Sequence, residues 1–196
     1  MNAVLNRRRL VADVLAERGE TLLVSALGAP SYDAAAVGDH PLNFHLWGAM
    51  GSAAMIGLGL ALAQPERRVL VITGDGELLM GLGALATIAA ERPRNLAILV
   101  LDNEAFGETG RQTGLTGRGV ALAGIAAAAG FPATLEIAQA KDTGALVELL
   151  YRTPGPVLAV AKISLEPEPQ VLPERDGRYP TQRFRATLLG PERATR

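Results

Sequence analysis

The sequence predicts an α/β fold, namely a doubly wound and mostly parallel sheet with helices on both faces. Two continuous apolar runs, at 67–73 and 95–101, have the composition of strands that are buried on both faces. A helical pattern at 78–90 lies between them, as expected for a right-handed crossover between parallel strands. Strand-like and helix-like segments continue to alternate as far as residue 163. Together these observations indicate an open sheet.

The remaining elements follow from periodicity and from Gly and Pro residues. The chain begins with an amphipathic helical pattern at 3–17, and a short strand at 21–27 ends before Gly28 and Pro30. The elements expected further along are a helix at 120–129 ended by Gly130, a strand at 134–137, a helix at 143–151 and a strand at 157–163.

The composition changes after residue 163. Prolines between 166 and 173 cannot continue a sheet, and Pro180 and Pro191 bracket a short helix that carries Phe184. We therefore expect a domain at 1–163 followed by a tail at 164–196. The tail is either a surface strap or an arm that docks on a partner.

Residues 46–63 form an apolar run of 18 residues. A membrane-spanning helix needs about 20 such residues, and this run contains Gly48, Gly51 and Gly57. We expect a buried helix whose small residues at 51–62 allow another subunit to pack closely, which predicts an oligomer. No signal-like apolar segment follows the basic residues at 7–9, so we expect no membrane partner and a cytoplasmic location.

Composition excludes several classes of protein. The chain has 196 residues, of which 48% are hydrophobic, so a substantial core is expected. The 19 basic and 20 acidic residues nearly cancel, which argues against a nucleic-acid partner. The absence of cysteine excludes disulfides and cysteine-ligated clusters. With His40 and His45 as the only histidines, a histidine-rich metal or Ser-His-Asp site is poorly supplied. We expect His45 to be packed beside Phe44 and Trp47, and a position facing the active site is the alternative.

Polar residues stand at the end of each central apolar run. Gly74-Asp75-Gly76 follows the first run, and Asp102-Asn103 ends the second. Parallel strands joined by a crossover place both ends at one edge of the sheet, and neighbouring strands lie about 4.8 Å apart. Carboxylate and carboxamide oxygens suit Mg²⁺, which in turn suits a diphosphate. The glycines allow backbone to approach phosphate, whose charge the next helix N-terminus favours.

Two other interpretations compete with this one. Gly-Asp-Gly alone is typical of a tight turn in which Asp bonds its own backbone. A dinucleotide-binding fingerprint needs a third glycine where Leu79 stands. The second polar segment at a matching position in the topology favours the metal–diphosphate interpretation.

The spacing resembles the thiamine-diphosphate motif, which begins with Gly-Asp-Gly and ends in Asn. The segments 43–65, 78–87 and 102–112 are similar to sulfopyruvate and phosphonopyruvate decarboxylases, above all to the beta subunit of the former. The resemblance extends over most of 21–163. Its paired motifs are specific to the cofactor and much less specific to the substrate.

The resemblance implies a set of site residues. Mg²⁺ would be bound by the side chains of Asp75 and Asn103 and by the backbone carbonyl of Ala105, and the amides of Gly76 and Glu77 would meet the diphosphate. The implied cofactor-binding residues are Gly48, Ala49, Met50, Gly74, Asp75, Gly76, Glu77, Asn103, Ala105 and Phe106.

Two catalytic positions, Met50 and Thr109, are also implied, and Gly48 lies beside the first. The carbonyl of Gly48 would accept a bond from the exocyclic amine of the cofactor, and Met50 would be the apolar wedge that bends it. An ordinary core methionine is the alternative for Met50. Thr109 stands where related pyruvate decarboxylases have an acidic residue, next to Glu108.

Arg111 lies in the same segment as Thr109, and two interpretations remain open for it. It either pairs with an anionic substrate tail or is a solvated loop arginine. The family's Thr-Gly-x-Gln-x-Thr pattern departs at its end, where Gly114 replaces the final threonine.

Thiamine catalysis in this family also requires a glutamate from a pyrimidine-binding domain, for which this chain has no room. The resemblance therefore implies half of a split enzyme, inactive without an alpha-type partner chain. The expected activity is decarboxylation of a small anionic 2-oxo acid to an aldehyde. A carboligase subunit of the acetolactate-synthase type and a non-catalytic cofactor-binding scaffold are the alternatives.

Overall fold

The computed structural model describes residues 5–194 and contains a six-stranded sheet in the order β2-β1-β3-β4-β8-β7. Every neighbouring pair in this sheet is parallel, so the predicted doubly wound fold is confirmed. A short antiparallel pair, β5 and β6, lies beyond β4. The strands are β1 (Leu22–Ser25), β2 (Asn43–His45), β3 (Val69–Gly74), β4 (Leu96–Asp102), β5 (Ala105–Phe106), β6 (Gln112–Thr113), β7 (Ala133–Ile137) and β8 (Val157–Lys162).

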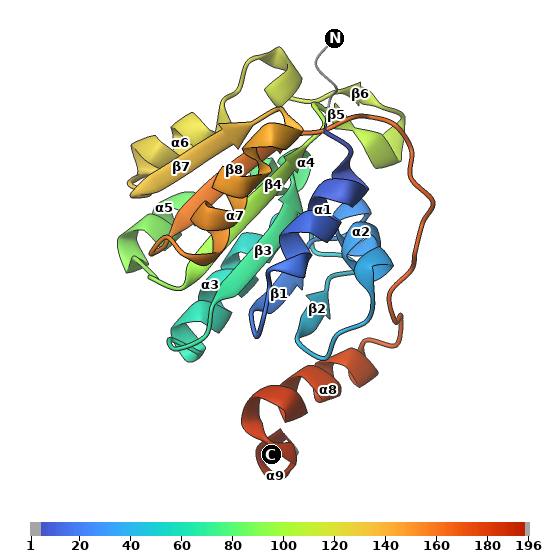
Figure 1. The fold of residues 1–196 in the computed structure, drawn as a ribbon, viewed down its shortest axis with the longest axis vertical. Coiled ribbons are helices and arrows are strands. Elements are labelled where there is room, and N and C mark those ends of the chain that lie inside the picture. The colour runs from blue at the N-terminus through green and yellow to red at the C-terminus, as the bar shows by residue number, and fades with distance from the viewer. Residues whose placement is uncertain (1–4, 195–196) are drawn as a thin grey trace.

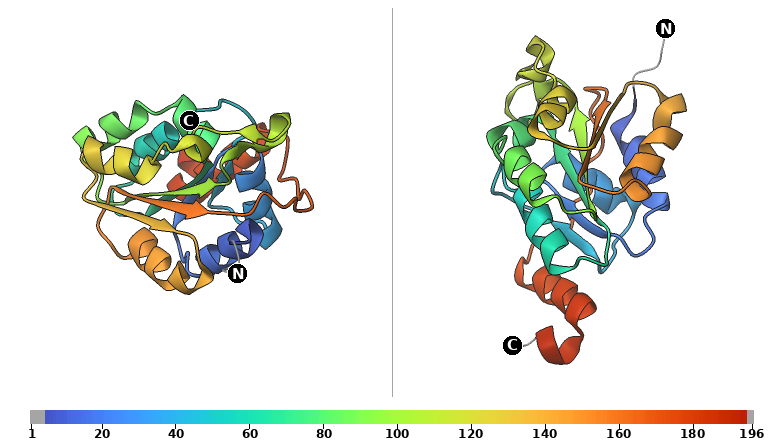
Figure 2. Two further views of the ribbon diagram at one scale, coloured as in Figure 1. Left: turned by 90° about the horizontal axis from the view of Figure 1, so that it is seen from above. Right: turned by 90° about the vertical axis from the view of Figure 1, so that its left-hand side faces the viewer.

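Helices cover both faces of the sheet (Figures 1 and 2). The helices α1 (Arg7–Ala16), α2 (Ala29–Val37) and α7 (Thr143–Tyr151) lie on one face. On the other face lie α3 (Ala53–Ala63), α5 (Ala84–Glu91) and α6 (Leu122–Ala129). The short helix α4 (Asp75–Met80) begins directly at the end of β3, at the carboxyl edge of the sheet.

The core is divided by the central strands. Alternate residues of β3 point to opposite faces, so that Val69 and Val71 pack under α3 and α5 whereas Leu70 and Ile72 pack under α1. All seven residues of β4 are buried. This confirms that the two apolar runs are strands buried on both faces, and it makes the ends of β3 and β4 a firm support for a site.

Several element boundaries differ from the predictions. The helix expected at 78–90 is two helices, because Gly81 and Gly83 interrupt it. The helix expected from residue 46 begins at Ala53, and 46–52 is irregular. The first helix begins at Arg7 rather than residue 3, and residues 1–4 lie outside the described part of the chain. Both α2 and β2 were missed, because a nine-residue helix and a three-residue strand are too short for a clear period.

The small residues of α3 serve mainly its own sheet. A Cβ on Gly57 would lie 2.3 Å from Cγ2 of Val71, so glycine lets α3 sit directly on β3. Met55 and Leu62 of the same helix face outward. We expected the small residues of this helix to pack on another subunit. On its buried half they instead pack on the sheet of the same chain. No helix among the described residues is long and apolar enough to cross a membrane.

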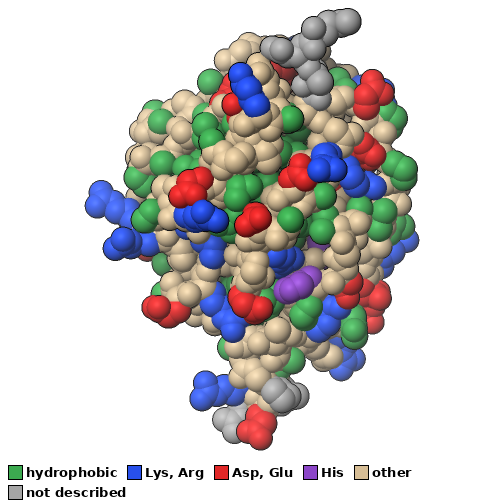
Figure 3. Space-filling view, in the orientation of Figure 1, with side chains coloured by type: hydrophobic (Ala, Val, Ile, Leu, Met, Phe, Trp, Pro, Cys, Tyr) green, Lys and Arg blue, Asp and Glu red, His purple; other side chains and the backbone are tan. Residues whose placement is uncertain are grey.

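The tail lies along the body as a strap (Figure 1). The Trp47 indole N–H donates to the carbonyl of Glu174 at 2.9 Å, and the rings of Phe184 and Phe44 lie 5.5 Å apart. The tail ends in α8 (Arg178–Leu189) and α9 (Pro191–Ala194). Pro180 was expected to precede this helix but lies inside the first turn of α8. Its missing N–H costs nothing there, because N–H groups in a first turn have no partner within the helix. Charges of both signs are mixed on the face shown in Figure 3.

Candidate functional site

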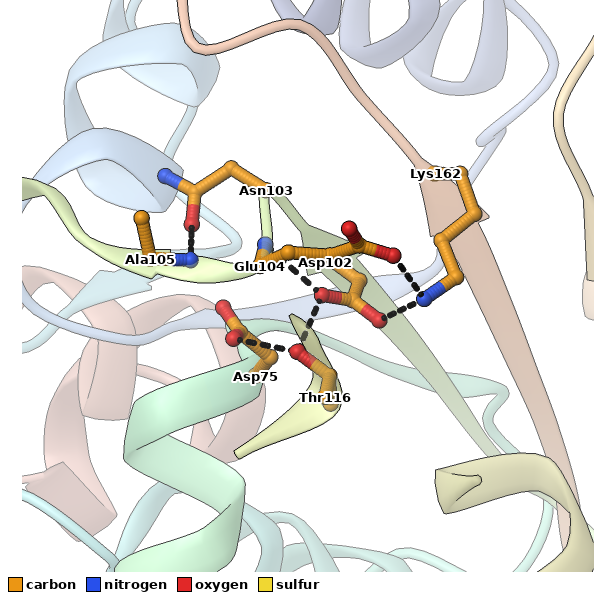
Figure 4. Close-up of polar contacts among 7 residues, drawn as sticks. All are labelled: Asp75, Asp102, Asn103, Glu104, Ala105, Thr116 and Lys162. Atoms are coloured by element: carbon orange, nitrogen blue, oxygen red, sulfur yellow. Dashed lines mark hydrogen bonds and ion pairs between the residues drawn. The ribbon is translucent and has the colours of Figure 1, made fainter. Parts of the chain in front are cut away.

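The ends of β3 and β4 bring the predicted metal-binding residues to one edge. The two strands pair in parallel with Gly74 opposite Leu101, so Asp75 and Asn103 follow at the same edge. Figure 4 shows them beside Asp102 and Thr116. The predicted convergence of the two motifs at one sheet edge is confirmed.

Asp75 is a buried carboxylate at the start of α4, with 4% of its surface exposed. Burial is the main cause that raises its pKa, and the nearby Asp102 carboxylate raises it further. Its Oδ2 lies 3.0 Å from the hydroxyl of Thr116. No ion pair in the described residues joins it to a basic side chain. A bound cation would compensate this buried negative charge.

A network behind Asp75 was not predicted. Thr116 Oγ1 lies 2.8 Å from Oδ1 of Asp102 as well as 3.0 Å from Asp75, and a hydroxyl has only one proton to share between them. Lys162 Nζ donates at 2.8 Å to both Asp102 and Glu104. Burial opposes the charge of Lys162, but these hydrogen bonds outweigh it and raise its pKa. The one signal in the sequence was Lys162 itself, a charge at the end of an apolar strand.

Asn103 and Ala105 form a local turn. The Asn103 Oδ1 accepts the backbone N–H of Ala105 at 3.0 Å and retains a second lone pair. Asp75, Asn103 and the carbonyl of Ala105 together offer hard oxygen donors, which suit Mg²⁺. The described residues contain no group of three or more His, Asp or Glu side chains placed to hold a metal. The donor set therefore fits a site that a diphosphate and water would complete.

A cavity of about 350 Å³ opens at this edge. The cavity is also lined by the start of the tail, at residues 163–168 and 170, and by Arg7 and Tyr32. Gly48 and Ala49 are not among the residues that line it. The predicted site residues that do line the cavity are Met50, Gly74, Asp75, Gly76, Glu77, Asn103, Ala105, Phe106 and Thr109.

The segment with Met50 lies at the mouth of the cavity. Gly48, Ala49 and Met50 are all exposed, and Met50 exposes 45% of its surface. The interpretation of Met50 as a core methionine is therefore wrong. Ala49 has a φ of 59°, which is uncommon for a residue with a side chain. A strained, open segment beside a cavity is typical of a ligand contact.

The side chain of Glu77 has a role that the sequence did not reveal. The carboxylate is buried, and Oε1 accepts the backbone N–H of Gly51 at 2.9 Å and of Ala53 at 3.1 Å. Its Oε2 accepts the hydroxyl of Thr73. Only the backbone amide of Glu77 remains a candidate for the diphosphate.

Residues 106–112 form an exposed loop that contains the 3₁₀ turn η1 (Gly107–Thr109). The Thr109 hydroxyl donates to the side chain of Gln112 at 3.3 Å, and Gln112 donates back to the Thr109 carbonyl at 3.0 Å. Arg111 lines the cavity and has a φ of 59°. Gly114 follows, and a Cβ there would lie 3.2 Å from Oδ2 of Asp75. The glycine at this position leaves room for the buried carboxylate.

His45 is packed, as predicted. Its Nδ1 lies 2.6 Å from the hydroxyl of Ser25, and it does not line the cavity beside Asp75. Burial lowers the pKa of His45 to about 4, so the ring is neutral near pH 7.

Comparisons with known proteins agree with the geometry. Sulfopyruvate decarboxylase subunit beta of Methanothermobacter thermautotrophicus is 44% identical over 109 residues, which are 56% of this chain and 58% of that protein. Phosphonopyruvate decarboxylase of Streptomyces viridochromogenes is 39% identical over 181 residues, which are 90% of this chain and 44% of that protein. This chain thus spans about half the length of these relatives.

A solved structure shares the fold. The thiamine diphosphate-dependent 4-hydroxybenzoylformate decarboxylase of Rhodococcus jostii RHA1 superimposes with a TM-score of 0.70 at 18% identity, over 85% of this chain and 34% of that one. Residues 27–161 match the model of the family described as "Thiamine pyrophosphate enzyme, C-terminal TPP binding domain". Because this match spans more than half of the 196 residues, the chain belongs to the thiamine pyrophosphate enzyme family, in which it matches the C-terminal cofactor-binding domain.

Proposed function

We propose that the chain is a subunit of a thiamine diphosphate-dependent carboxy-lyase that acts on a short 2-oxo acid with an anionic tail. Sulfopyruvate and phosphonopyruvate are the substrates named for its relatives. The observation that carries the proposal is Asp75, a buried carboxylate with no basic partner among the described residues, beside Asn103 at the edge that faces the cavity.

Asp75, Asn103 and the carbonyl of Ala105 would hold Mg²⁺, and the backbone amides of Gly76 and Glu77 would meet the diphosphate at the start of α4. A buried edge with hydrogen-bonded carboxylates supports this assignment, because it orients the ligands before the ion arrives. When bound, the cofactor supplies the electron sink for the loss of CO₂.

The exposed segment of Gly48, Ala49 and Met50 would contact the cofactor rings. Met50 lines the cavity and is exposed, and these two observations support this assignment. Gly74 and Phe106 line the same cavity and would complete the cofactor contacts.

The loop at 106–112 would contact the substrate. Arg111 and Thr109 both line the cavity, and a guanidinium suits a sulfonate, phosphonate or carboxylate. Thr109 would then act at the protonation step, where its hydroxyl replaces the acidic group of related enzymes. Glu108 is the neighbouring acid on the same loop and lies next to Gly28.

A partner chain is part of this proposal. Apolar side chains lie exposed on α3, α4 and the Met50 segment, with Met80 exposing 66% of its surface and Leu62 51%. A partner with a pyrimidine-binding domain would cover this surface and supply the activating glutamate. The term "subunit beta" in the name of one relative supports a two-chain enzyme.

The test is reconstitution. The chain, with residues 1–163 as its cofactor-binding domain, is assayed alone and with a candidate pyrimidine-domain partner, following CO₂ release from sulfopyruvate and phosphonopyruvate. We expect turnover by the pair only. Equal turnover by the lone chain would refute the split enzyme, and a product built from two substrate units would identify a carboligase. Binding of thiamine diphosphate without turnover by any pair would identify a scaffold.

A further inference from the structure

Two contacts join the segment before α3 to α4, the helix that begins at Asp75, and to the residue just after it. The first is the carboxylate of Glu77, which is 5% exposed. It accepts the backbone N–H groups of Gly51 and Ala53 at 2.9 and 3.1 Å, and also the hydroxyl of Thr73. A buried carboxylate with three donors is held in one orientation, because losing any bond leaves a buried polar group unsatisfied. Glu77 thus ties residues 51–53 to the end of β3.

The second contact is between two glycines. Gly51 has a φ of 88°, and a Cβ there would lie 2.9 Å from the backbone nitrogen of Gly81. A Cβ on Gly81 would lie only 2.0 Å from the carbonyl oxygen of Gly51. Gly81 itself has a φ of −111°, which any residue adopts. Position 81 therefore requires glycine because a side chain would collide with the neighbouring backbone, and not because of its own backbone conformation.

These contacts bear on Met50, which immediately precedes Gly51. The side chain of Met50 is 45% exposed, so packing does little to hold it in place. Its position is determined instead by the backbone of Gly51, which is held by Glu77 and Gly81. The same short helix α4 carries Asp75 as its first residue and Glu77 as its third.

We propose that Glu77 and Gly81 are positioning residues that hold Met50 at a set place relative to Asp75. They thereby couple the segment that contacts the cofactor rings to the groups that anchor the diphosphate. This inference rests on the proposed function, since Met50 and Asp75 matter together only in a thiamine diphosphate site. Its consequence is a split between binding and turnover, because the anchor at Asp75 and Asn103 stays intact when the Met50 segment moves.

The sharpest test compares Gly81→Ala with Gly83→Ala in the reconstituted enzyme. A Cβ on Gly83 would meet no atom of the described residues within 4 Å, so Gly83→Ala changes the same linker without touching Gly51. Since a misplacement of about 1 Å can cost roughly 100-fold in rate, we expect Gly81→Ala to lower kcat by that order and to leave Mg²⁺-dependent cofactor affinity within about threefold. Gly83→Ala should match the wild type in both.

A second readout needs no cofactor. Trp47 is the only tryptophan, lies three residues before Met50, and donates from its indole N–H to the carbonyl of Glu174 in the tail. Displacing the segment changes the surroundings of this indole, so its fluorescence emission in the isolated chain reports the displacement. We expect a shifted emission in Gly81→Ala and an unchanged one in Gly83→Ala.

A second pair of variants tests Glu77 and remains informative if Gly81→Ala fails to fold. Glu77→Gln keeps an acceptor for the two amides and can donate to the Thr73 hydroxyl, so it should keep the Trp47 emission and lose less turnover than Glu77→Leu. Glu77→Leu has a similar volume but leaves Gly51 and Ala53 without an acceptor, so turnover should fall and emission shift.

Wild-type turnover and emission in both Gly81→Ala and Glu77→Leu would overturn the inference. A wild-type enzyme that binds no thiamine diphosphate would instead refute the proposed function. In that case the Trp47 emission still decides whether Glu77 and Gly81 hold the segment.

Discussion

The two sides of the cavity are built differently. On the sheet side, Asp75, Asp102 and Thr116 are at most 5% exposed and share a hydrogen-bond network. On the other side, all seven residues of the 106–112 loop are exposed. Phe106 is the last residue of β5 and Gln112 the first of β6, and the five residues between them are irregular or 3₁₀. The proposed anchor for the cofactor is thus held by a buried hydrogen-bond network, whereas the surface proposed to meet the substrate is exposed.

The largest effect on stability is expected from His45, a partly buried group outside the cavity beside Asp75. Its pKa is about 4 in the fold against 6.5 unfolded, with Asp39, Arg183 and Arg18 as the charged groups that act on it. The neutral ring is favoured by folding, so this contribution is complete above pH 6.5 and is lost as the pH falls from 6.5 to 4. At about 1.4 kcal/mol per pKa unit, the loss approaches ~3 kcal/mol.

Urea denaturation of the wild type and His45→Gln at several pH values between 7 and 4 measures this contribution. The variant should lack the part of the pH dependence that belongs to His45. Parallel stability curves for the two proteins over this range would show that burial of His45 does not control the pH dependence of stability.

A smaller loss of stability is expected when the ammonium group of Lys162 is removed from the buried edge. In Lys162→Met, the carboxylate of Asp102, which is 1% exposed, loses its one basic partner among the described residues. Breaking a fully buried pair costs about 3–5 kcal/mol, and because Lys162 is itself partly exposed we expect about 2 kcal/mol. Arg152→Met, which breaks the exposed pair with Glu148, is the control and should cost less than about 0.5 kcal/mol. Equal effects in thermal or urea denaturation would remove the distinction between buried and exposed charge.

Next in size is the hydroxyl that lies between the two carboxylates. Thr116→Val keeps the shape of the side chain but removes the donor shared by Asp75 and Asp102, which should cost about 1–2 kcal/mol of stability. Because Asp75 loses an orienting group, Mg²⁺-dependent cofactor affinity should fall roughly tenfold in calorimetry. Thr113→Val, on the exposed strand β6, is the matched control. An unchanged affinity in Thr116→Val would mean that the network does not support the ligand.

The smallest effect on stability is expected in the exposed loop. Arg111→Ala should change the free energy of unfolding by less than about 0.5 kcal/mol. In the reconstituted enzyme it should raise KM for an anionic 2-oxo acid by roughly tenfold, because a charge-assisted hydrogen bond is worth about 1.5–3 kcal/mol. An unchanged KM would support the alternative that Arg111 is a solvated loop residue.

The parts of the fold with a strong local signal were predictable from the sequence. The apolar runs of β3 and β4 are long and continuous, and the position of Asp75 and Asn103 after them follows from the right-handed crossover. The ends of helices were predicted wrongly where a glycine acts through a tertiary contact. Gly81 splits the predicted helix because it lies against Gly51, and no local pattern reveals a contact with a residue 30 positions earlier.

The supporting residues of the site were hidden for a related reason. Glu77 reads as an ordinary first-turn glutamate, yet its carboxylate turns inward to the amides of Gly51 and Ala53. Thr116 lies 41 residues from Asp75, and Lys162 lies 60 residues from Asp102. Motifs predict the groups that meet a ligand, whereas the groups that orient them are brought together only by folding.

The central claim is that Asp75 anchors the cofactor through a divalent cation. The direct measurement is calorimetric titration of thiamine diphosphate, with and without Mg²⁺, into the chain combined with its partner. The wild type and the exposed-site control Asp13→Asn should bind only with Mg²⁺, and Asp75→Asn should lose more than the roughly 100-fold that outer-shell changes cost. Undiminished, metal-independent binding by Asp75→Asn would contradict the account and place the cofactor elsewhere.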